Sequence, residues 1–485
     1  MNALFARIVV VVSGAAILVV ETLATRLVAP YVGLTLESTS AVIGVALAGI
    51  AAGASLGGRW SDVLPPRRVA AGALAIGGLG VLAVRPLVRV LGPALGPGPL
   101  AAVLLVAAST LVSVTALAMV TPAVIRSRLD RVEGSGAVVG QLSSASTIGS
   151  IAGVFLTGFV LVTLLPVDVI LIVTALSCLV LAAITALVRN RTAVAVTAVA
   201  AVLLGGALVL VPGRCDVDTV YYCASVQTEP GRSERPGLRV LVLDDLRHSA
   251  VDLDDPAHLE FAYTQRFADA IDTAFPAGVP LEAVHLGGGG FTMPRWLAAT
   301  RPGSTSTVLE VDRGVVDLGR RELGVDGIPG LDVRVGDART LLADMLPASA
   351  DVVVGDAFGA RSVPWHLATA EFAADVHRVL RHDGVFVLNV IDHDPWNLLA
   401  AEAATLADRF PHVALMARPE QLAPGGGGNA VIVASDLPID VAALGLRATA
   451  RGEPDSVQGD NGTRAFAGDA RVLTDEWAPV DQLIG

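Results

Sequence analysis

Glycine and acidic residues follow four consecutive apolar runs in the second half of the sequence. The run Gly287–Gly290 follows the first, and the carboxylates after the next three are those of Glu310 and Asp312, of Asp337, and of Asp356. Glycines at such a position let a backbone approach a ligand and begin the next helix. A carboxylate after the second run can accept hydrogen bonds from both ribose hydroxyls, and one after the third can accept from an adenine amino group. The spacing predicts an adenosine-type site, with Asp356 beside the reacting atom.

The residues predicted to bind the adenosine-containing ligand are Gly287, Gly288, Gly289, Glu310, Asp312, Asp337 and Ala338. The catalytic candidates are Asp356 and His366, because a carboxylate and an imidazole can both accept a proton near neutral pH. Two alternatives stay open. The first is that the acids only cap strand ends, in a sheet that binds no ligand. The second is that His366 is not catalytic and makes a hydrogen bond within its loop.

These residues are spaced by alternating apolar and helical stretches. The apolar runs from residue 282 onward are 282–287, 306–312, 331–337, 350–358 and 384–392. Nearly continuous apolar strands joined by helices predict a parallel sheet covered on both faces, with its ligand at the carboxyl ends of the strands. Two later runs, 412–420 and 429–436, are predicted to complete the sheet as an antiparallel pair. The stretch 219–254 predicts a small antiparallel sheet, followed by a helix over about 256–274.

The composition divides the 485 residues into two unlike parts. The whole chain is 53% hydrophobic and 16% charged, well below the roughly 25% charge of soluble proteins. Residues 1–212 carry a balance of +6 and residues 213–485 a balance of −18. We therefore expect a membrane domain over 1–212 and an acidic water-soluble part after it. The acidic balance excludes nucleic acid as an expected partner, since phosphate binding favours a basic face.

Seven apolar segments are long enough to cross a bilayer, which needs about 20 residues. They are 8–30, 40–58, 69–91, 99–121, 140–164, 167–188 and 192–212. Arginine gathers in alternate loops, and the positive-inside rule then places the N-terminus in the cytoplasm. An odd number of spans puts the soluble part outside the cytoplasm. This orientation would reverse with one helix more or fewer.

Two cysteines bear on the same question. Cys215 and Cys223 lie just after the last apolar segment, and we expect them to form a disulfide in an oxidising compartment. The alternative is two unrelated thiols. Cys178 lies inside the sixth segment, where it is expected to be a small buried residue. No histidine accompanies the pair at metal-ligand spacing, so no metal site is predicted.

Over residues 219–395 the sequence resembles the spermidine synthase (aminopropyltransferase) family. The motifs that carry the resemblance are LGGGGFTMPRWL, VLEVD, VRVGDAR and VVVGDAF. The layout also resembles a bacterial membrane-fused group of this family with a transporter-like N-terminal domain. The loop from Gly58 to Arg68 resembles the loop between the second and third helices of major-facilitator transporters. The implied fold class is a multi-pass α-helical membrane domain followed by an α/β Rossmann-like, class I methyltransferase-like domain with a small preceding β-sheet.

The resemblance implies an activity and partners. The donor would be decarboxylated S-adenosylmethionine, the acceptor a small-molecule amine such as a diamine, and the assembly a homodimer in a lipid bilayer. Glu310 would hold the ribose and Asp337 the adenine, and Asp356 would position or deprotonate the attacking amine. The domains would be 1–212 for the membrane part, 213–255 for the small sheet, and 256–485 for the Rossmann-like part.

The sequence departs from the family's pattern at several positions. Gly290 stands where the family has the aspartate that binds the donor amino group, and Gly359 stands where it has a second aspartate near the acceptor. The family's Tyr-His-Glu motif is matched to the stretch His258–Glu260, and a usual glutamine to His248. The substrate-binding candidates that remain are Glu260, His248 and Asp392.

The lost carboxylates leave three functions open, because a diamine is a dication that needs acidic partners. The first is aminopropyl transfer. The second is methyl transfer from ordinary S-adenosylmethionine. The third is a non-catalytic soluble domain attached to a transporter-like membrane module.

Overall fold

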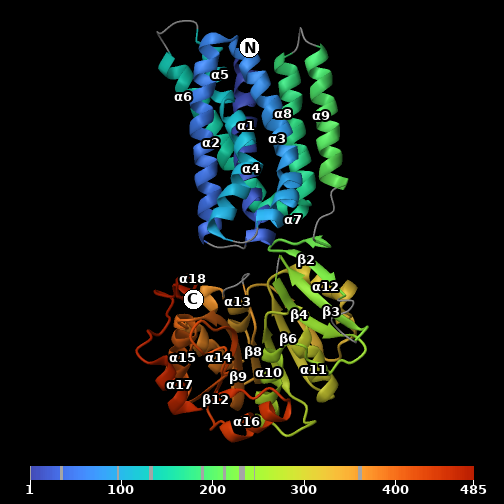
Figure 1. The fold of residues 1–485 in the computed structure, drawn as a ribbon, viewed down its shortest axis with the longest axis vertical. Coiled ribbons are helices and arrows are strands. Elements are labelled where there is room, and N and C mark those ends of the chain that lie inside the picture. The colour runs from blue at the N-terminus through green and yellow to red at the C-terminus, as the bar shows by residue number, and fades with distance from the viewer. Residues whose placement is uncertain are drawn as a thin grey trace. The chain divides into compact units, whose positions relative to one another are not determined.

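The computed structural model describes residues 2–32, 36–95, 98–129, 135–186, 191–210, 215–228, 235–244, 246–358 and 363–485. The chain forms two compact units, Met1–Tyr222 and Cys223–Gly485 (Figure 1). The predicted acceptor-side position Gly359 lies outside the described residues.

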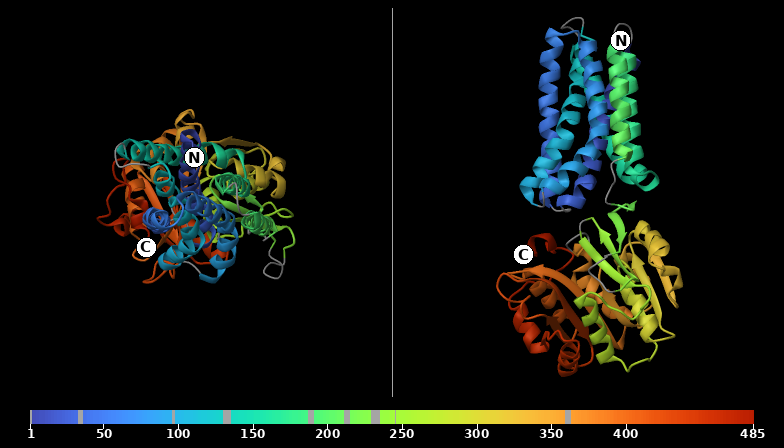
Figure 2. Two further views of the ribbon diagram at one scale, coloured as in Figure 1. Left: turned by 90° about the horizontal axis from the view of Figure 1, so that it is seen from above. Right: turned by 45° about the vertical axis from the view of Figure 1, so that its right-hand side comes forward.

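The first unit is a bundle of long apolar helices, drawn from blue to green in Figure 1 and seen from above in Figure 2. Its elements are α1 (Ala3–Val32), α2 (Leu36–Val63), α3 (Pro66–Leu95), α4 (Pro99–Ala118), α5 (Val120–Arg126), α6 (Ser135–Leu156), the π-helix η1 (Thr157–Leu161), α7 (Val162–Leu164), α8 (Val167–Ala186), α9 (Arg191–Leu210) and strand β1 (Val217–Asp218). Among the described residues six helical segments are long and apolar enough to cross a membrane, which is compatible with a multi-pass membrane domain. The seventh predicted segment is α9, whose side chains are described only from residue 197 to 206.

Small residues allow two pairs of these helices to pack closely. A Cβ added to Gly149 of α6 would collide with the backbone of Val11 in α1, and one added to Gly153 would lie 2.6 Å from the carbonyl oxygen of Ala15. A Cβ on Gly57 of α2 would likewise lie 2.6 Å from the Met119 carbonyl oxygen. Close backbone approach of this kind is how helices associate where hydrophobic burial gives little driving force.

The cysteines have the predicted states. Cys215 and Cys223 are both disulfide-bonded, and Cys178 is a buried free thiol. The disulfide prediction is therefore confirmed. Its thiolates are consumed by the bond and are not free to bind zinc.

The second unit contains all the predicted site residues. Its elements are β2 (Cys223–Gln227), β3 (Leu238–Leu243), β4 (Leu246–Asp252), α10 (Ala262–Ala274), β5 (Glu282–Leu286), α11 (Thr292–Thr300), β6 (Thr305–Glu310), α12 (Arg313–Glu322), η2 (Val325–Gly327), β7 (Leu331–Val335), α13 (Ala338–Ala343), β8 (Ala350–Gly355), η3 (Trp365–Leu367), α14 (Ala370–Val379), β9 (Leu380–His393), α15 (Asn397–Arg409), β10 (His412–Ala417), β11 (Gly427–Ser435), α16 (Val441–Ala450), β12 (Ser456–Gln458), α17 (Asp460–Ala467) and α18 (Val480–Leu483). Strands β2, β3 and β4 pair antiparallel, as predicted.

The larger sheet has the strand order β12-β10-β11-β9-β8-β5-β6-β7. Strands β5 to β9 are parallel, and β11 runs antiparallel between β9 and β10. This confirms the predicted parallel sheet and its antiparallel completion.

Alternate side chains of the central strands enter cores on opposite faces of the sheet. In β9 Phe386 packs with α14 and α15, whereas Val387 packs with the core that holds α10 and α11. The same alternation occurs in β8 between Val353 and Val354. Because both faces are covered, most buried side chains of these strands are apolar, which explains the continuous apolar runs in the sequence.

The order in which the strands are added to the sheet reverses between β5 and β8, although the strands stay parallel. From β5 it proceeds outward through β6 and β7, then returns to place β8 on the other side of β5. Ligands of open α/β sheets bind outside the carboxyl ends of the strands at such a switch point. Gly287 follows β5 and Asp356 follows β8, and the Asp356 amide donates to the Leu286 carbonyl oxygen at 3.0 Å.

Two parts of the second unit differ from the sequence prediction. Helix α10 begins at Ala262 rather than at 256, because residues 256–257 form a turn in which the His258 amide donates to the Asp255 carbonyl oxygen at 3.0 Å. The stretch 437–470, from which the sequence predicts no element, contains α16, the edge strand β12 and α17.

Candidate functional site

The glycine loop after β5 is bound to the carboxylate that ends β6. Gly287 has a φ of +89°, and a Cβ added to it would lie 2.6 Å from the Asp356 carbonyl oxygen, so only glycine fits there. The amides of Gly288 and Gly289 donate to Glu310 Oε2 at 2.8 and 3.3 Å. Burial raises the pKa of Glu310, and the backbone hydrogen bonds act against that shift. The predicted neighbours Gly287, Gly288, Gly289 and Glu310 are therefore brought together.

Glu310 also shapes the start of the next helix. Its Oε1 accepts from the Asp312 amide at 2.8 Å. Asp312 is the N-cap of α12, where its carboxylate accepts from the Gly314 amide at 2.8 Å. This carboxylate therefore stabilises the helix, as N-caps do. The three hydrogen bonds to Glu310 leave part of its acceptor capacity for a ligand hydroxyl.

Asp337 caps α13 and contacts His366. Its Oδ1 accepts from the Thr340 amide at 3.1 Å, and its Oδ2 lies 2.8 Å from His366 Nε2. Burial acts to raise the pKa of Asp337, but the hydrogen bonds from Thr340 and His366 outweigh it and hold the pKa below its usual value. Ala338, the first residue of α13, is buried in the core. Asp337 and Ala338 thus end β7 as predicted.

Asp356 is the most perturbed carboxyl of the strand ends. The Tyr263 hydroxyl donates to its Oδ2 at 2.9 Å, and the Asn389 amide donates to its Oδ1 at 2.9 Å. Burial raises the pKa of Asp356 to about 6, against the opposing effect of these two hydrogen bonds. A carboxylate with a pKa just below neutrality is suited to take a proton from a substrate.

The structure places His366 away from this carboxyl. His366 pairs with Asp337, and its carbonyl oxygen accepts from Arg339 at 3.1 Å. Its side-chain hydrogen bond joins its loop to the start of α13, so it is not a hydrogen bond within its own loop either. The prediction that His366 accompanies Asp356 as a catalytic residue has no geometric support.

Two of the predicted substrate-binding acids are engaged elsewhere. Glu260 lies 3.0 Å from His258, and neither contacts Asp356. Asp392 is fully buried and accepts from the amides of Leu399 and Gly485 at 2.9 and 3.0 Å, so it secures the start of α15 and the end of the chain. We correct the prediction for Asp392, because its oxygens serve backbone groups inside the fold.

His248 lies on β4, one residue before the serine that faces the glycine loop. Burial lowers the pKa of His248 to about 4, so this side chain is neutral at pH 7. The next residue, Ser249, has a buried Oγ that would lie 2.5 Å from a Cβ added to Gly290. A carboxylate side chain at position 290 would therefore have to displace Ser249.

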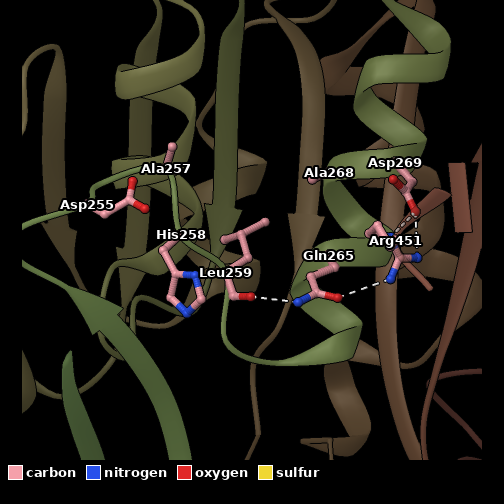
Figure 3. Close-up of a pocket in the computed structure, with 8 residues that line it drawn as sticks. All are labelled: Asp255, Ala257, His258, Leu259, Gln265, Ala268, Asp269 and Arg451. Atoms are coloured by element: carbon pink, nitrogen blue, oxygen red, sulfur yellow. Dashed lines mark hydrogen bonds and ion pairs between the residues drawn. The ribbon is translucent and has the colours of Figure 1, made fainter. Parts of the chain in front are cut away.

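A separate pocket lies beside α10 (Figure 3). Its volume is about 340 Å³, and it is lined by Asp255, Ala257, His258, Leu259, Gln265, Ala268, Asp269 and Arg451. Its polar groups pair with one another, since Arg451 donates to Asp269 at 2.8 Å and to Gln265 at 3.1 Å. Gln265 in turn donates to the Leu259 carbonyl oxygen at 2.7 Å. The lining of this pocket includes none of Gly287–Gly290, Glu310, Asp337 and Asp356, and we assign it no substrate.

Sequence reasoning missed Tyr263 and Asn389. The sequence matches the motif to His258–Glu260, whereas the tyrosine that reaches Asp356 lies three residues after Glu260, in the first turn of α10. The signal for Asn389 is its type, because it is a lone amide within an otherwise apolar stretch, GVFVLNVI. A polar residue in a strand buried on both faces needs a hydrogen-bond partner, and here that partner is Asp356.

The chain is similar to polyamine aminopropyltransferases of known sequence. It is 27% identical over 217 residues to the enzyme of Vibrio vulnificus, covering 42% of this chain and 70% of the relative. It is 26% identical over 164 residues to the enzyme of Neisseria meningitidis serogroup A, covering 33% of this chain and 61% of the relative, less than two thirds of its length. No family model matches the chain.

A solved structure extends the likeness to the fold. A probable spermidine synthase from Corynebacterium glutamicum is similar with a TM-score of 0.50 and 28% identity, covering 54% of this chain and 97% of that chain. The fold of the second unit is thus spermidine synthase-like. Together the comparisons support a transferase enzyme of the spermidine synthase-like kind.

Proposed function

We propose that this chain is a membrane-bound aminopropyltransferase that moves an aminopropyl group from decarboxylated S-adenosylmethionine to a diamine. The observation that carries the proposal is the half-buried carboxyl of Asp356, which Tyr263 and Asn389 hold directly beside the glycine loop. The named activity of the relatives from Vibrio vulnificus and Neisseria meningitidis supports the same reaction class.

The adenosine half of the donor fits the strand ends. The loop after β5 accommodates a close ligand because Gly287 adopts a positive φ. Glu310 would accept from the ribose hydroxyls with the acceptor capacity left beyond its backbone bonds. Asp337 would accept from the adenine amino group beside its contact with His366.

The reaction is a displacement at carbon. The amine nitrogen forms a bond to the methylene carbon next to the sulfonium, and the carbon–sulfur bond breaks with its electron pair moving to sulfur. The products are a secondary ammonium and neutral methylthioadenosine. Asp356 takes the proton that the attacking ammonium must lose, and the pKa of about 6 keeps its carboxylate form populated at pH 7. Orientation of the two substrates supplies the rest of the acceleration.

The methyltransferase alternative rests on Gly290. The position has no carboxylate, and Ser249 occupies the adjacent space, so the amino group of a decarboxylated donor lacks an acidic partner there. Ordinary S-adenosylmethionine carries a carboxylate beside its amino group and depends less on such a partner. Donor preference therefore separates the two transferase activities.

The membrane location belongs to the same proposal. The six long apolar helices would cross the bilayer with the N-terminus in the cytoplasm, and α9 would be a seventh span that leads to an extracytoplasmic second unit. The disulfide of Cys215 and Cys223 supports an oxidising compartment. A homodimer is proposed from the family resemblance alone.

Calorimetry on the full chain in detergent tests which donor binds. We expect decarboxylated S-adenosylmethionine to bind, and Glu310→Ala to abolish binding because both ribose contacts and the loop anchor are lost. Thr405→Val on α15 is the matched control, because it removes the buried hydrogen bond that the Thr405 hydroxyl accepts from the Leu473 amide. Preference for ordinary S-adenosylmethionine would favour methyl transfer, and binding of neither donor would contradict both activities.

A further inference from the structure

Asp356 lies at the end of a series of hydrogen-bonded polar side chains, of which Asn389 is buried. Its Oδ1 accepts from Asn389 Nδ2 at 2.9 Å, and Asn389 Oδ1 accepts from Asn429 Nδ2 at 3.0 Å. Asn389 lies in the middle of β9 and Asn429 in the neighbouring strand β11. Two amides in series thus connect Asp356 to the next strand of the sheet.

The second amide fixes the orientation of the first. An amide side chain donates through nitrogen and accepts through oxygen. If Asn389 were flipped, its oxygen would face the carboxylate of Asp356 and its NH₂ would face the NH₂ of Asn429, and both contacts would be repulsive. Because Asn429 donates to its oxygen, Asn389 presents its donor to Asp356.

A buried arginine contacts the residue at the other end of this series of hydrogen bonds. Arg266 of α10 donates to the Asn429 carbonyl oxygen at 3.1 Å. It also donates to the Asp455 carboxylate, through Nε at 3.0 Å and through Nη2 at 2.8 Å. The side chains of Arg266 and Asp455 are 1% and 0% exposed. Arg451, on the wall of the pocket in Figure 3, also donates to Asp455 at 3.3 Å.

A contribution to folding stability does not explain why the fold contains such a network. Replacing a buried ion pair by apolar residues of similar volume is often neutral or stabilising, whereas a buried pair can fix one arrangement of the groups around it. Here the group at the end of the arrangement is Asp356. Helix α10 supplies both Arg266 and Tyr263, so one element contacts the network at both of its ends.

We propose that Asn389 and Asn429 are positioning residues, which orient the Asp356 carboxylate and favour its ionised form so that it takes the proton in the transfer step. The role in transfer rests on the proposed function, but the effect on Asp356 does not. Within the described residues, the groups that act on this carboxyl are the Tyr263 phenol from α10 and the Asn389 amide from β9, and burial raises the Tyr263 pKa well above its usual value. No other titratable side chain of the described part is in hydrogen-bond contact with it.

Infrared titration of the full chain in detergent tests this without turnover. The C=O band of protonated Asp356 is identified as the band that Asp356→Asn removes, and its midpoint in the unchanged chain is expected at about pH 6. Asn389→Leu removes a hydrogen bond to the charged form, so the midpoint should rise by roughly one to two pH units. Asn429→Leu should raise it less, since only the orientation of Asn389 is loosened.

Ser435→Ala is the matched control, because Ser435 lies on the same strand as Asn429 and its buried Oγ donates to the Gly384 carbonyl oxygen at 3.0 Å. A midpoint unchanged in both asparagine variants, or raised equally by Ser435→Ala, would overturn the proposal. If Asn389→Leu does not fold, Asn429→Leu decides alone. A raised midpoint in a chain without aminopropyl transfer would support the positioning role and refute the proposed function.

Discussion

Asp356 is a single carboxyl whose surroundings determine when it can accept a proton. Its folded pKa of about 6 lies above the ordinary 3.8 because burial disfavours the charged form. A base works only when ionised, so its competent form is populated above pH 6 and is lost as the pH falls through that value.

We therefore predict a pH dependence of catalysis. The value of kcat/KM for aminopropyl transfer should be level near pH 7 to 8 and fall about tenfold per pH unit below about pH 6. A pH–rate profile of the full chain measures this. An acid limb centred near the ordinary aspartate value would contradict the assignment of Asp356 as the proton acceptor.

Glu402 is a second buried carboxyl, on helix α15, and it acts on stability instead. Burial raises the pKa of Glu402 from 4.5 to about 8. An acid whose folded pKa is raised binds its proton more tightly in the folded state, so the fold loses stability as the pH rises from 4.5 to 8. At pH 7 this loss amounts to roughly 3 kcal/mol.

Glu402→Gln should remove that pH dependence. We expect its apparent Tm to match that of the unchanged chain near pH 4.5 and to exceed it increasingly toward pH 8, because glutamine is neutral throughout. Thermal unfolding across this pH range makes the comparison. A constant difference at every pH would show that Glu402 does not titrate as inferred.

At the scale of elements, the close packing of α1 against α6 gives a further prediction. Gly149→Ala places a methyl group against the backbone of Val11, and overpacking of this kind costs about 1–3 kcal/mol. Gly140→Ala on the same helix meets nothing within 4 Å and serves as the control. Thermal unfolding in detergent should show a lowered Tm for the first variant alone, and equal Tm values would argue against the close α1–α6 contact.

The sequence predicts these elements better than it predicts the contacts between them. Apolar runs and the residues after them suffice to place Glu310, Asp337 and Asp356 at the ends of β6, β7 and β8. The contacts of Tyr263 and Asn389 with Asp356 join residues 93 and 33 positions apart, and no local pattern encodes them. Local spacing also cannot tell a ligand-binding acid from one that serves backbone amides, which is why Asp392 was assigned wrongly.

At the scale of the whole molecule, the chain combines an apolar helical unit with an acidic α/β unit. Its disulfide lies where the sequence passes from one to the other. In the proposed membrane topology, this position would link the redox state of the two cysteines to the side of the membrane on which the second unit lies.

Thiol labelling should therefore report the orientation. After mild reduction of intact cells, an impermeant thiol reagent should label Cys215 and Cys223 and leave the buried Cys178 unlabelled. A chain in which both are replaced by serine is the control for specificity. Labelling that requires cell lysis would place the second unit in the cytoplasm and reverse the proposed topology.

The most direct test of the central claim is transfer of a labelled aminopropyl group by the purified full chain. With decarboxylated S-adenosylmethionine labelled in its aminopropyl carbons and putrescine as acceptor, mass spectrometry should find labelled spermidine and methylthioadenosine in equal amounts. Asp356→Asn should lower kcat/KM by roughly 100-fold or more, because the proton acceptor is lost. No labelled spermidine from the unchanged chain, or undiminished transfer by Asp356→Asn, would contradict the account.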